Sequence, residues 1–584
     1  MKTISFFIFL LASYYAYAQP ELRYEENISL TYAEAVDAYA SLSEKYDEAH
    51  LFTEGLTDVG KPLHLFVISG DGDFNPESLH KKEKVILLIN NGIHPGEPCG
   101  IDASIKFAHT VLSEKKYKKL LDKVVVAIIP VYSIGGALNR NEYWRPQQPG
   151  PKELGFRGNA RNLDLNRDFV KQDTRNAQSF SEIYHKWQPD VFLDTHTTNG
   201  SDHKHVITLI SSNKNRYSTE DLGDFVKNTF EEQLYSDMKK TDYEMIPYIS
   251  WMHADPQEGV IEYFTNGNFS TGYTAMFNTI SFMTENHVYK AFKDRVLSVY
   301  EFELSLLETS RKYAETIKKL RKEAEQAVKA QDEFVIEWKL DTTRHDSFEY
   351  TGYKYLMSES PLTGLMRKAY NRDSVFTADI PFYRYYNPKY TVKKPEMYIV
   401  QQAWREVIDA LKRNEVKMYR LAEDTKLEAE LYYINNNNKA ERQYNGHIAN
   451  VDFDLCTEIQ EIQYYKGDYL VPVNQASNNY IVEMLEPNGA ASFFRWNFFD
   501  SVLERREYMI PSGFEEAAAK YLEENPGLRS KLEEKKRNEP EFAGDHYAQL
   551  WFIYTHSPYD EKTYLRYPVA RLMKPVDLPL QKLE

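Results

Sequence analysis

The chain has 584 residues, of which 42% are hydrophobic and 27% are charged. This length suggests roughly two to four domains, and burying a sizeable core presents no difficulty. The formal net charge of −16 at pH 7 argues against nucleic acid or an anionic membrane as a partner, because both bind clustered Lys and Arg. Only 2 cysteines are present, which excludes a disulfide scaffold and a cysteine-based zinc site.

Residues 1–18 have the three parts of a signal peptide. Lys2 supplies a positive charge, residues 4–12 are apolar, and Ala16-Tyr17-Ala18 forms a small-x-small cleavage site. A short N-terminal anchor is the alternative, but the apolar stretch is shorter than the roughly 18 residues that a transmembrane helix needs. We therefore expect an exported protein, periplasmic or secreted, with no membrane span after signal cleavage.

The elements that follow alternate between helix and strand. Apolar residues recur with helical spacing over residues 28–48, a strand is expected at 64–68, and the apolar run 85–89 predicts a strand buried on both faces. A helix is expected over residues 101–121 and a second buried strand over residues 124–131. This order predicts an α/β unit with a largely parallel core sheet, in which ligands gather at the carboxyl ends of the strands.

The loop after residues 85–89 carries the first candidate metal ligands. Glycine and proline at positions 92, 95 and 96 exclude a helix there, so His94 and Glu97 are expected in a loop at the end of the strand. An imidazole and a carboxylate three residues apart can reach one cation, and this pair suits zinc. His-x-x-Glu alone is common, and a surface loop with two polar residues is the alternative.

A second imidazole follows a later predicted strand. Residues 190–194 lead directly into Thr195-His196, so His196 is expected at a strand end, as His94 is. A single histidine in this position is usually structural, but two of them with Glu97 indicate a His₂Glu site. Three protein ligands leave the fourth position to water, which is the arrangement of a catalytic zinc site.

A carboxylate ends a further apolar stretch. Residues 272–285 suggest another strand that closes on Glu285, and a solvated strand end is the alternative. Beside a metal-bound water, a carboxylate can take a proton from that water and later pass it to the leaving amine. Glu285 is therefore the candidate general base.

Four motifs follow one another between residues 94 and 285. They are His94-Pro95-Gly96-Glu97, Asp164-Leu165-Asn166-Arg167-Asp168-Phe169, Asp194-Thr195-His196 and the stretch that ends in Glu285. In this order they resemble the zinc carboxypeptidases of the carboxypeptidase A type, over about residues 30–310, nearest to the carboxypeptidase E/D-like pattern. The resemblance implies a mixed, largely parallel central sheet flanked by helices, one zinc ion (Zn2+) on His94, Glu97 and His196, and Glu285 as the general base.

The same resemblance implies residues that hold the substrate. Asn166 and Arg167 would grip the terminal carboxylate of a peptide, since a guanidinium group matches a carboxylate bidentately and the amide adds a neutral donor. Arg157 lies nine residues before Asn166 and is expected to polarise the scissile carbonyl. This spacing favours Arg157 over Arg145 and Arg161.

Two tyrosines are candidates for closing over the substrate. The family's spacing of 22 residues before Glu285 gives Tyr263, and Tyr273 is the alternative if the loop length differs. The specificity position, 15 residues before Glu285, falls on Ser270, so no preference for a basic C-terminal residue is implied.

The sequence changes character after the predicted catalytic region. Residues 304–330 predict a charged closing helix, so the catalytic domain is expected to span residues 19–330. Short strands rich in Tyr, Val and Glu then predict a β-rich, sandwich-like accessory domain over residues 331–490. Residues 491–584 are expected to form a mixed α/β tail with helices that packs on the accessory or the catalytic domain.

These observations predict an exported zinc metallocarboxypeptidase acting on peptides with a free C-terminal carboxylate. One alternative is a zinc deacylase of the aspartoacylase or succinylglutamate desuccinylase type, which shares the zinc motif and Asp-Leu-Asn-Arg. The export signal and the long C-terminal region count against it. The other alternative is a non-catalytic peptide- or glycan-binding protein on a decayed peptidase fold. The complete ligand set and Glu285 argue against such decay.

Overall fold

The computed structural model describes residues 21–251 and 258–582, so the predicted signal peptide at 1–18 lies outside the described residues. The chain divides into two compact units. Unit 1 comprises Met1–Val392, Lys412–Glu415 and Gln475–Tyr480, and unit 2 comprises Lys393–Leu411, Val416–Asn474 and Ile481–Glu584. None of the helices in the described ranges is both long and apolar enough to cross a bilayer.

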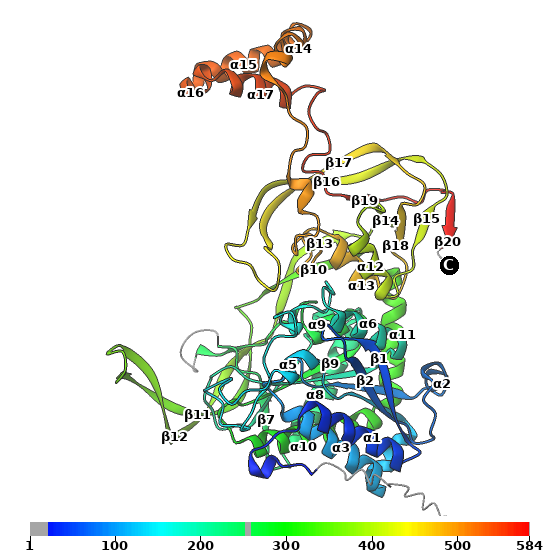
Figure 1. Cartoon of the computed structure of the whole chain (residues 1–584), viewed down its shortest axis with the longest axis vertical. Coiled ribbons are helices and arrows are strands. Elements are labelled where there is room, and N and C mark those ends of the chain that lie inside the picture. The colour runs from blue at the N-terminus through cyan, green and yellow to red at the C-terminus, as the bar shows by residue number, and fades with distance from the viewer. Residues whose placement is uncertain (1–20, 252–257, 583–584) are drawn as a thin grey trace, which may run out of the picture. The chain divides into compact units, whose positions relative to one another are not determined.

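An eight-stranded mixed sheet forms the centre of unit 1 (Figure 1). Its strands, in spatial order, are β1 (Ala49–Leu56), β2 (Pro62–Ile68), β4 (Val124–Ile129), β3 (Val85–Asn90), β5 (Val191–Thr197), β9 (Ile280–Asn286), β6 (Ile207–Ser211) and β7 (Met245–Pro247). The four central strands β4, β3, β5 and β9 run parallel to one another. Every residue of β3, β4 and β5 is buried, which confirms the prediction of strands covered on both faces.

Helices cover both faces of this sheet. They are α1 (Tyr32–Lys45), α2 (Pro76–Lys81), α3 (Cys99–Ser113), α4 (Lys115–Lys118), α5 (Ile134–Leu138), α6 (Arg175–Trp187), α7 (Glu220–Phe225), α8 (Glu231–Met238), α9 (Ser270–Ala275), α10 (Phe292–Lys312) and α11 (Ala314–Ala330). Short helical turns are η1 (Tyr24–Glu26), η2 (Lys119–Asp122), η3 (Leu165–Arg167), η4 (Lys214–Arg216) and the π-helical η5 (Val226–Phe230). Leu87 of β3 joins a core with α3 and α10, whereas Phe192 of β5 meets the ring of Phe180 in α6, with centroids 6.1 Å apart.

The structure corrects three of the expected elements. The apolar stretch 272–285 is not one strand, because α9 occupies its first part and β9 begins at Ile280. Asn278 adopts the left-handed conformation (φ 58°) between them, which turns the chain into β9. The helix expected over 101–121 ends as α3 at Ser113, and the helix expected over 304–330 is the end of α10 followed by α11, with Tyr313 between them.

Unit 1 continues beyond the boundary expected at residue 330. A long hairpin of β11 (Asp346–Glu359) and β12 (Met366–Tyr383) joins this unit because β12 pairs with β8 (Val260–Ile261), Phe382 opposite Val260. A second small sheet pairs β10 (Glu333–Leu340) with β13 (Tyr386–Lys393). Strands assigned to an accessory domain from sequence therefore belong to the same compact unit as the central sheet.

Unit 2 confirms a β-rich second region and contains a helical part. Its sheet has the order β17 (Asn450–Tyr464), β16 (Thr425–Lys439), β19 (Val569–Leu572), β14 (Met397–Val400), β18 (Tyr469–Pro472), β15 (Tyr419–Leu421) and β20 (Leu580–Lys582). Neighbouring strands pair antiparallel. The other helices of the described residues are α12 (Arg405–Arg413) and α13 (Asn478–Leu485), which each belong partly to unit 1, and η7 (Asp500–Leu503), α14 (Pro511–Glu524), α15 (Pro526–Asn538), α16 (Pro540–Gly544) and α17 (His546–Thr555). The last four share a core of their own.

Candidate metal centre and active site

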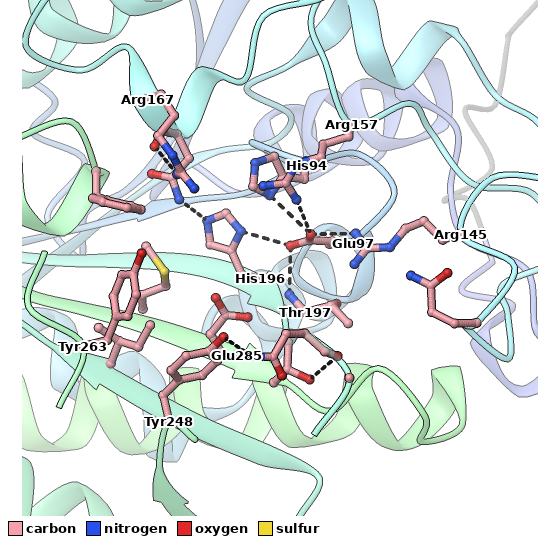
Figure 2. A pocket seen from close by; sticks show the side chains of 18 residues that line it. His94, Glu97, Arg145, Arg157, Arg167, His196, Thr197, Tyr248, Tyr263 and Glu285 are labelled. Atoms are coloured by element: carbon pink, nitrogen blue, oxygen red, sulfur yellow. Dashed lines mark hydrogen bonds and ion pairs between the residues drawn. The ribbon is translucent and has the colours of Figure 1, made fainter. Parts of the chain in front are cut away.

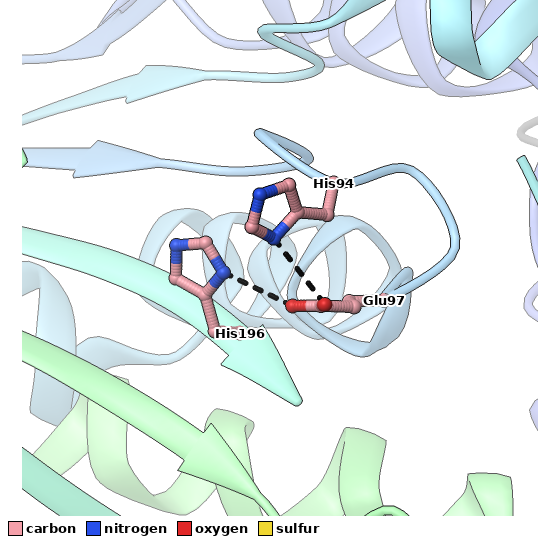
Figure 3. A group of neighbouring side chains, drawn as sticks. All are labelled: His94, Glu97 and His196. Carbon is pink, nitrogen blue, oxygen red and sulfur yellow. Dashed lines mark hydrogen bonds and ion pairs between the residues drawn. The ribbon is translucent and has the colours of Figure 1, made fainter. Parts of the chain in front are cut away.

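The three predicted ligands come together at the carboxyl edge of the central sheet (Figure 3). His94 lies in the loop after β3, Glu97 lies just before α3, and His196 is the penultimate residue of β5. Nδ1 of His94 is 3.3 Å from Oε1 of Glu97, and Nδ1 of His196 is 3.0 Å from Oε2 of Glu97. One donor atom from each residue lies within 4.8 Å of the others, so a single cation can reach all three.

Two aspartates hold the outer nitrogens of these imidazoles. Nε2 of His94 donates to Asp164 at 2.8 Å, and Nε2 of His196 donates to Asp194 at 2.9 Å. Each Nδ1 is thereby left to face Glu97, which is how histidines that bind a metal are usually oriented. Nδ1 of His94 is buried and makes no hydrogen bond within the described part of the chain. Two imidazoles and a carboxylate, with one ring nitrogen that makes no hydrogen bond, fit a zinc ion.

Close packing of α3 on β5 brings Glu97 to His196. Gly100, in the first turn of α3, leaves room for this approach, because a Cβ at that position would clash with the side chain of Thr195. The backbone N–H of Thr197 then donates to Oε2 of Glu97 at 2.9 Å. Contacts from both α3 and β5 therefore fix the carboxylate of Glu97.

Positive charge surrounds the carboxylate of Glu97. Nη1 of Arg145 lies 2.6 Å from its Oε1, and Nη1 of Arg157 lies 3.4 Å from the same oxygen. Burial disfavours the charged form, but Arg145 and His94 outweigh burial and hold the pKa of Glu97 well below its ordinary value. Glu97 is therefore ionised at neutral pH, as a metal ligand must be.

Glu285 lies beside the three ligands on the neighbouring strand. β9 runs parallel to β5 with Glu285 in register with His196. Burial raises the pKa of Glu285 to about 8, with the negative charges of Glu97 and Asp194 adding to the rise and His196 opposing it. Its Oε2 is buried and has no hydrogen-bond partner within the described residues, so this oxygen can exchange a proton with a group bound in the cavity.

A cavity of about 380 Å³ opens over these residues (Figure 2). Its lining is formed by His94, Glu97, Arg145, Gln147, Arg157, Asn166, Arg167, His196, Thr197, Thr198, Asn199, Gly200, Ile210, Tyr248, Tyr263, Phe269, Met283 and Glu285. The predicted metal ligands, the predicted base and the residues expected to bind the substrate thus share one cavity, with Tyr273 as the exception.

Asn166 and Arg167 are presented to the cavity by the short turn η3. Oδ1 of Asn166 accepts from the backbone N–H of Ser270 at 3.1 Å, which fixes the amide. Arg167 stacks its guanidinium group on the ring of Phe269, 4.3 Å from the centroid. The Ser270 hydroxyl, from the position expected to set specificity, is buried and donates to Asp194 at 2.5 Å.

Three arginines were weighed for the scissile carbonyl, and the structure places two of them in the cavity. Arg157 is half exposed and pairs with Asp164 at 2.9 Å. Arg145 is more buried and closer to Glu97. Arg161 does not line the cavity and donates to the backbone oxygen of Asp173 at 2.7 Å. The spacing from Asn166 predicts Arg157 for the scissile carbonyl, and the cavity lining contains both Arg157 and Arg145.

The two candidate tyrosines lie in different environments. Tyr263 lines the cavity, with its ring 5.5 Å from that of Phe269. Tyr273 lies in α9, is fully buried outside the cavity, and donates to Oδ1 of Asn414 at 2.7 Å. Ser270-Thr271-Gly272, directly before Tyr273, forms the start of this buried helix.

Sequence reasoning missed Tyr248 and assigned no role to Asp164 and Asp194. Tyr248 follows β7 and lines the cavity, where its hydroxyl accepts from Asn199 at 3.0 Å. An aromatic residue just after a short strand was its only signal. The two aspartates stand inside motifs that were quoted for other residues, and a carboxylate two residues before a ligand or a substrate-binding residue could have indicated a supporting role.

A family model described as zinc carboxypeptidase matches residues 36–355, which is more than half of the chain. The chain belongs to the zinc carboxypeptidase family. The match begins before β1 and ends within the β11–β12 hairpin, so it includes the whole cavity. Family membership implies zinc, for which His94, Glu97 and His196 are a suitable ligand set.

Solved structures similar to this chain include three metallocarboxypeptidases. A metallo-carboxypeptidase from Burkholderia cenocepacia has 16% identity and a TM-score of 0.35, over 47% of this chain and 68% of that one. A metallo-carboxypeptidase from Pseudomonas aeruginosa, in complex with (2-guanidinoethylmercapto)succinic acid, has 14% identity and a TM-score of 0.36, over 50% of this chain and 70% of that one. Carboxypeptidase A from Helicoverpa armigera has 12% identity and a TM-score of 0.37, over 50% of this chain and 74% of that one. No curated protein matches the chain.

Proposed function

We propose that this chain is an exported zinc-dependent carboxypeptidase that removes residues from the free C-terminus of peptides. The observation that carries the proposal is the convergence of His94, Glu97 and His196 beside Glu285 in one cavity of about 380 Å³. One zinc ion on these ligands would activate a water molecule and polarise the scissile carbonyl. Export rests on the signal-peptide pattern of residues 1–18.

Proton transfer is the task of Glu285 in this proposal. Its unsatisfied, buried Oε2 accepts the proton of the attacking water and then delivers it to the leaving amine. Arg157 donates to the scissile carbonyl oxygen as negative charge develops there, an effect worth about 3–4 kcal/mol per donor in comparable sites. The pairing of Arg157 with Asp164 holds that guanidinium group at the cavity.

The substrate is oriented by its terminal carboxylate. Asn166 and Arg167 receive this group, with Arg167 held flat against Phe269, and Tyr263 closes over the bound peptide. Ile210, Met283 and Phe269 give the same cavity an apolar lining, which favours an uncharged C-terminal side chain. The spacing of Arg157 from Asn166 supports our proposal that the chain is nearest to the carboxypeptidase E/D-like pattern.

A comparison of three substrates tests this proposal. The zinc-loaded protein should hydrolyse a peptide with a free C-terminal carboxylate and should be nearly inactive on the same peptide with a C-terminal amide. It should also leave N-acyl amino acids intact. Arg167→Met should raise KM for the free peptide and abolish the preference over the amide, whereas Arg161→Met, outside the cavity, should change neither. Faster cleavage of N-acyl amino acids would overturn the proposal in favour of a deacylase.

A further inference from the structure

The distal half of the β11–β12 hairpin exposes a cluster of large apolar side chains. We call this cluster the hairpin tip. It consists of Leu356 (69% exposed), Met357 (56%), Leu362 (93%), Leu365 (70%) and Met366 (60%). Contiguous exposed apolar surface of this kind marks an interaction site on a soluble domain.

Apolar residues of the tip lie on both faces of the hairpin and in its turn. Leu356 pairs with Ala369 and Met357 pairs with Lys368, so these neighbours face opposite sides of the two-stranded ribbon. Leu362 and Leu365 lie in the turn that joins β11 to β12. A flat protein surface, including that of a second copy of this chain, would cover only one face. An occupant of this tip must surround it.

Basic and aromatic side chains lie beside and behind the apolar residues of the tip, with Lys368 opposite Met357 and Arg367 opposite Ser358. Tyr355 and Tyr370 are opposite each other across the strands, and the Lys368 ammonium lies 3.9 Å and 5.5 Å from the centroids of their rings. Lys354 and Arg367 are exposed. Residues 354–368 contain three basic residues and one acidic residue, Glu359, in a chain whose overall charge is −16. The hairpin is therefore a locally positive element on an acidic protein.

The hairpin is held at its base and projects from unit 1. Arg372 pairs with Asp202 at 2.9 Å, Gly352 bridges to His203, and Phe382 pairs with Val260. Figure 1 shows the ribbon running away from the helices of unit 1 towards its turn. The pairs from Lys354 to Glu359 extend the ribbon by ~20 Å at about 3.4 Å per residue. The tip can therefore enter an environment that the rest of unit 1 does not enter.

We infer that the hairpin tip inserts into the surface of a lipid bilayer that carries anionic headgroups. Acyl chains enclose the apolar side chains on all sides, the tyrosines lie at the headgroup level, and the lysines and Arg367 meet lipid phosphates. Within the tip the two strands pair with each other, so few backbone N–H and C=O groups would enter the bilayer without a hydrogen-bond partner. The acidic chain as a whole argues against an anionic membrane, but this element alone touches it.

Vesicle sedimentation tests the inference on the full chain after signal removal. The protein should sediment with vesicles of phosphatidylcholine mixed with phosphatidylglycerol, and about tenfold less with phosphatidylcholine alone or at high salt. The double substitution Leu362→Asp/Leu365→Asp should reduce sedimentation about tenfold, and Arg367→Glu/Lys368→Glu should do the same on anionic vesicles only.

A matched control uses exposed apolar residues elsewhere. Val451 (49% exposed) and Ile459 (68%) lie on β17, and Val451→Asp/Ile459→Asp should leave sedimentation unchanged. Circular dichroism and urea midpoints equal to wild type show that each variant is folded. Failure to bind anionic vesicles, or equal loss in the control, overturns the inference. So does self-association by sedimentation velocity that the Leu362→Asp/Leu365→Asp variant abolishes, because a second copy would then be the occupant.

Discussion

Replacing the aspartates behind the two imidazoles is expected to weaken zinc binding by amounts that differ between the two sites. Outer carboxylates of this kind contribute about 10- to 100-fold to metal affinity, or about 1.4–2.7 kcal/mol. Asp194 has no exposed side-chain surface, so Asp194→Asn removes an unscreened charge beside His196 and should cost close to 100-fold. Asp164 is 21% exposed, so Asp164→Asn beside His94 should cost close to 10-fold, because solvent screens its charge.

Competition with a chelator measures the zinc Kd of each variant, and urea unfolding measures stability in parallel. Asp190→Asn is the matched control, because Asp190 is a buried carboxylate just before β5 that pairs with Arg321 and Lys318 rather than with a metal ligand. This variant should lose stability and keep its zinc affinity. Wild-type zinc affinity in both test variants, or a larger loss in Asp164→Asn than in Asp194→Asn, would refute the reasoning.

Three further results are expected. Glu285→Gln should lower kcat for peptide hydrolysis about 10²- to 10⁴-fold with unchanged zinc content by mass spectrometry, and unchanged turnover would exclude Glu285 as the base. Tyr263→Phe should lower kcat/KM about two- to tenfold. Tyr273→Phe should preserve kcat/KM but lower the free energy of unfolding in urea by about 1–3 kcal/mol, because it removes a buried donor to Asn414. The reverse pattern would assign the closing role to Tyr273. Burial raises the pKa of Asp102 from 3.8 to about 8, so the unfolded chain loses this proton first and the free energy of unfolding falls from about pH 4 to pH 8. This fall is at most about 6 kcal/mol, at 1.36 kcal/mol per pKa unit, and Asp102→Asn should flatten it. Urea titrations at several pH values measure the slope, and an unchanged slope in the variant would contradict the assignment to Asp102.

The central strands and the convergence of His94, Glu97 and His196 could be predicted because their signals are local. The run that forms β3 is apolar at successive positions, and glycine and proline end it immediately before Glu97. The carboxyl ends of parallel strands share one edge of a sheet, so His94 and His196 were expected to lie close together. Only the order of the strands, which puts β3 beside β5, had to come from the structure.

The placement of Tyr273 could not be predicted, because the contacts that decide it are distant in sequence. The stretch around it is rich in apolar and β-branched residues, as a strand would be, yet it begins with α9. The hydroxyl of Tyr273 reaches Asn414, and His185 of α6 lies 3.1 Å from the same hydroxyl. Such tertiary contacts override local propensity.

The extent of unit 1 also depends on contacts between residues that are distant in sequence. Residues 346–383 form two long strands, and the periodicity of a strand does not say which sheet it joins. The pairing of Phe382 with Val260 decides this, and β8 is only two residues long. A strand that short leaves almost no trace in a sequence, so the boundary expected at residue 330 and the observed continuation to Val392 differ.

The position of Glu285 depends on the register of β9, and the residues around it show how that register is fixed. Successive side chains on a strand face opposite sides, so a slip of one residue would turn this carboxylate away from the cavity. Met283 and Glu285 both line the cavity, whereas Phe282 joins the core and stacks on Phe230 with centroids 5.5 Å apart. Asn286 donates to the hydroxyl of Ser298 in α10 at 2.8 Å. A slip would expose Phe282 and leave the Asn286 amide buried without this acceptor, so the packing of α10 and the core under β9 holds the proposed base beside His196.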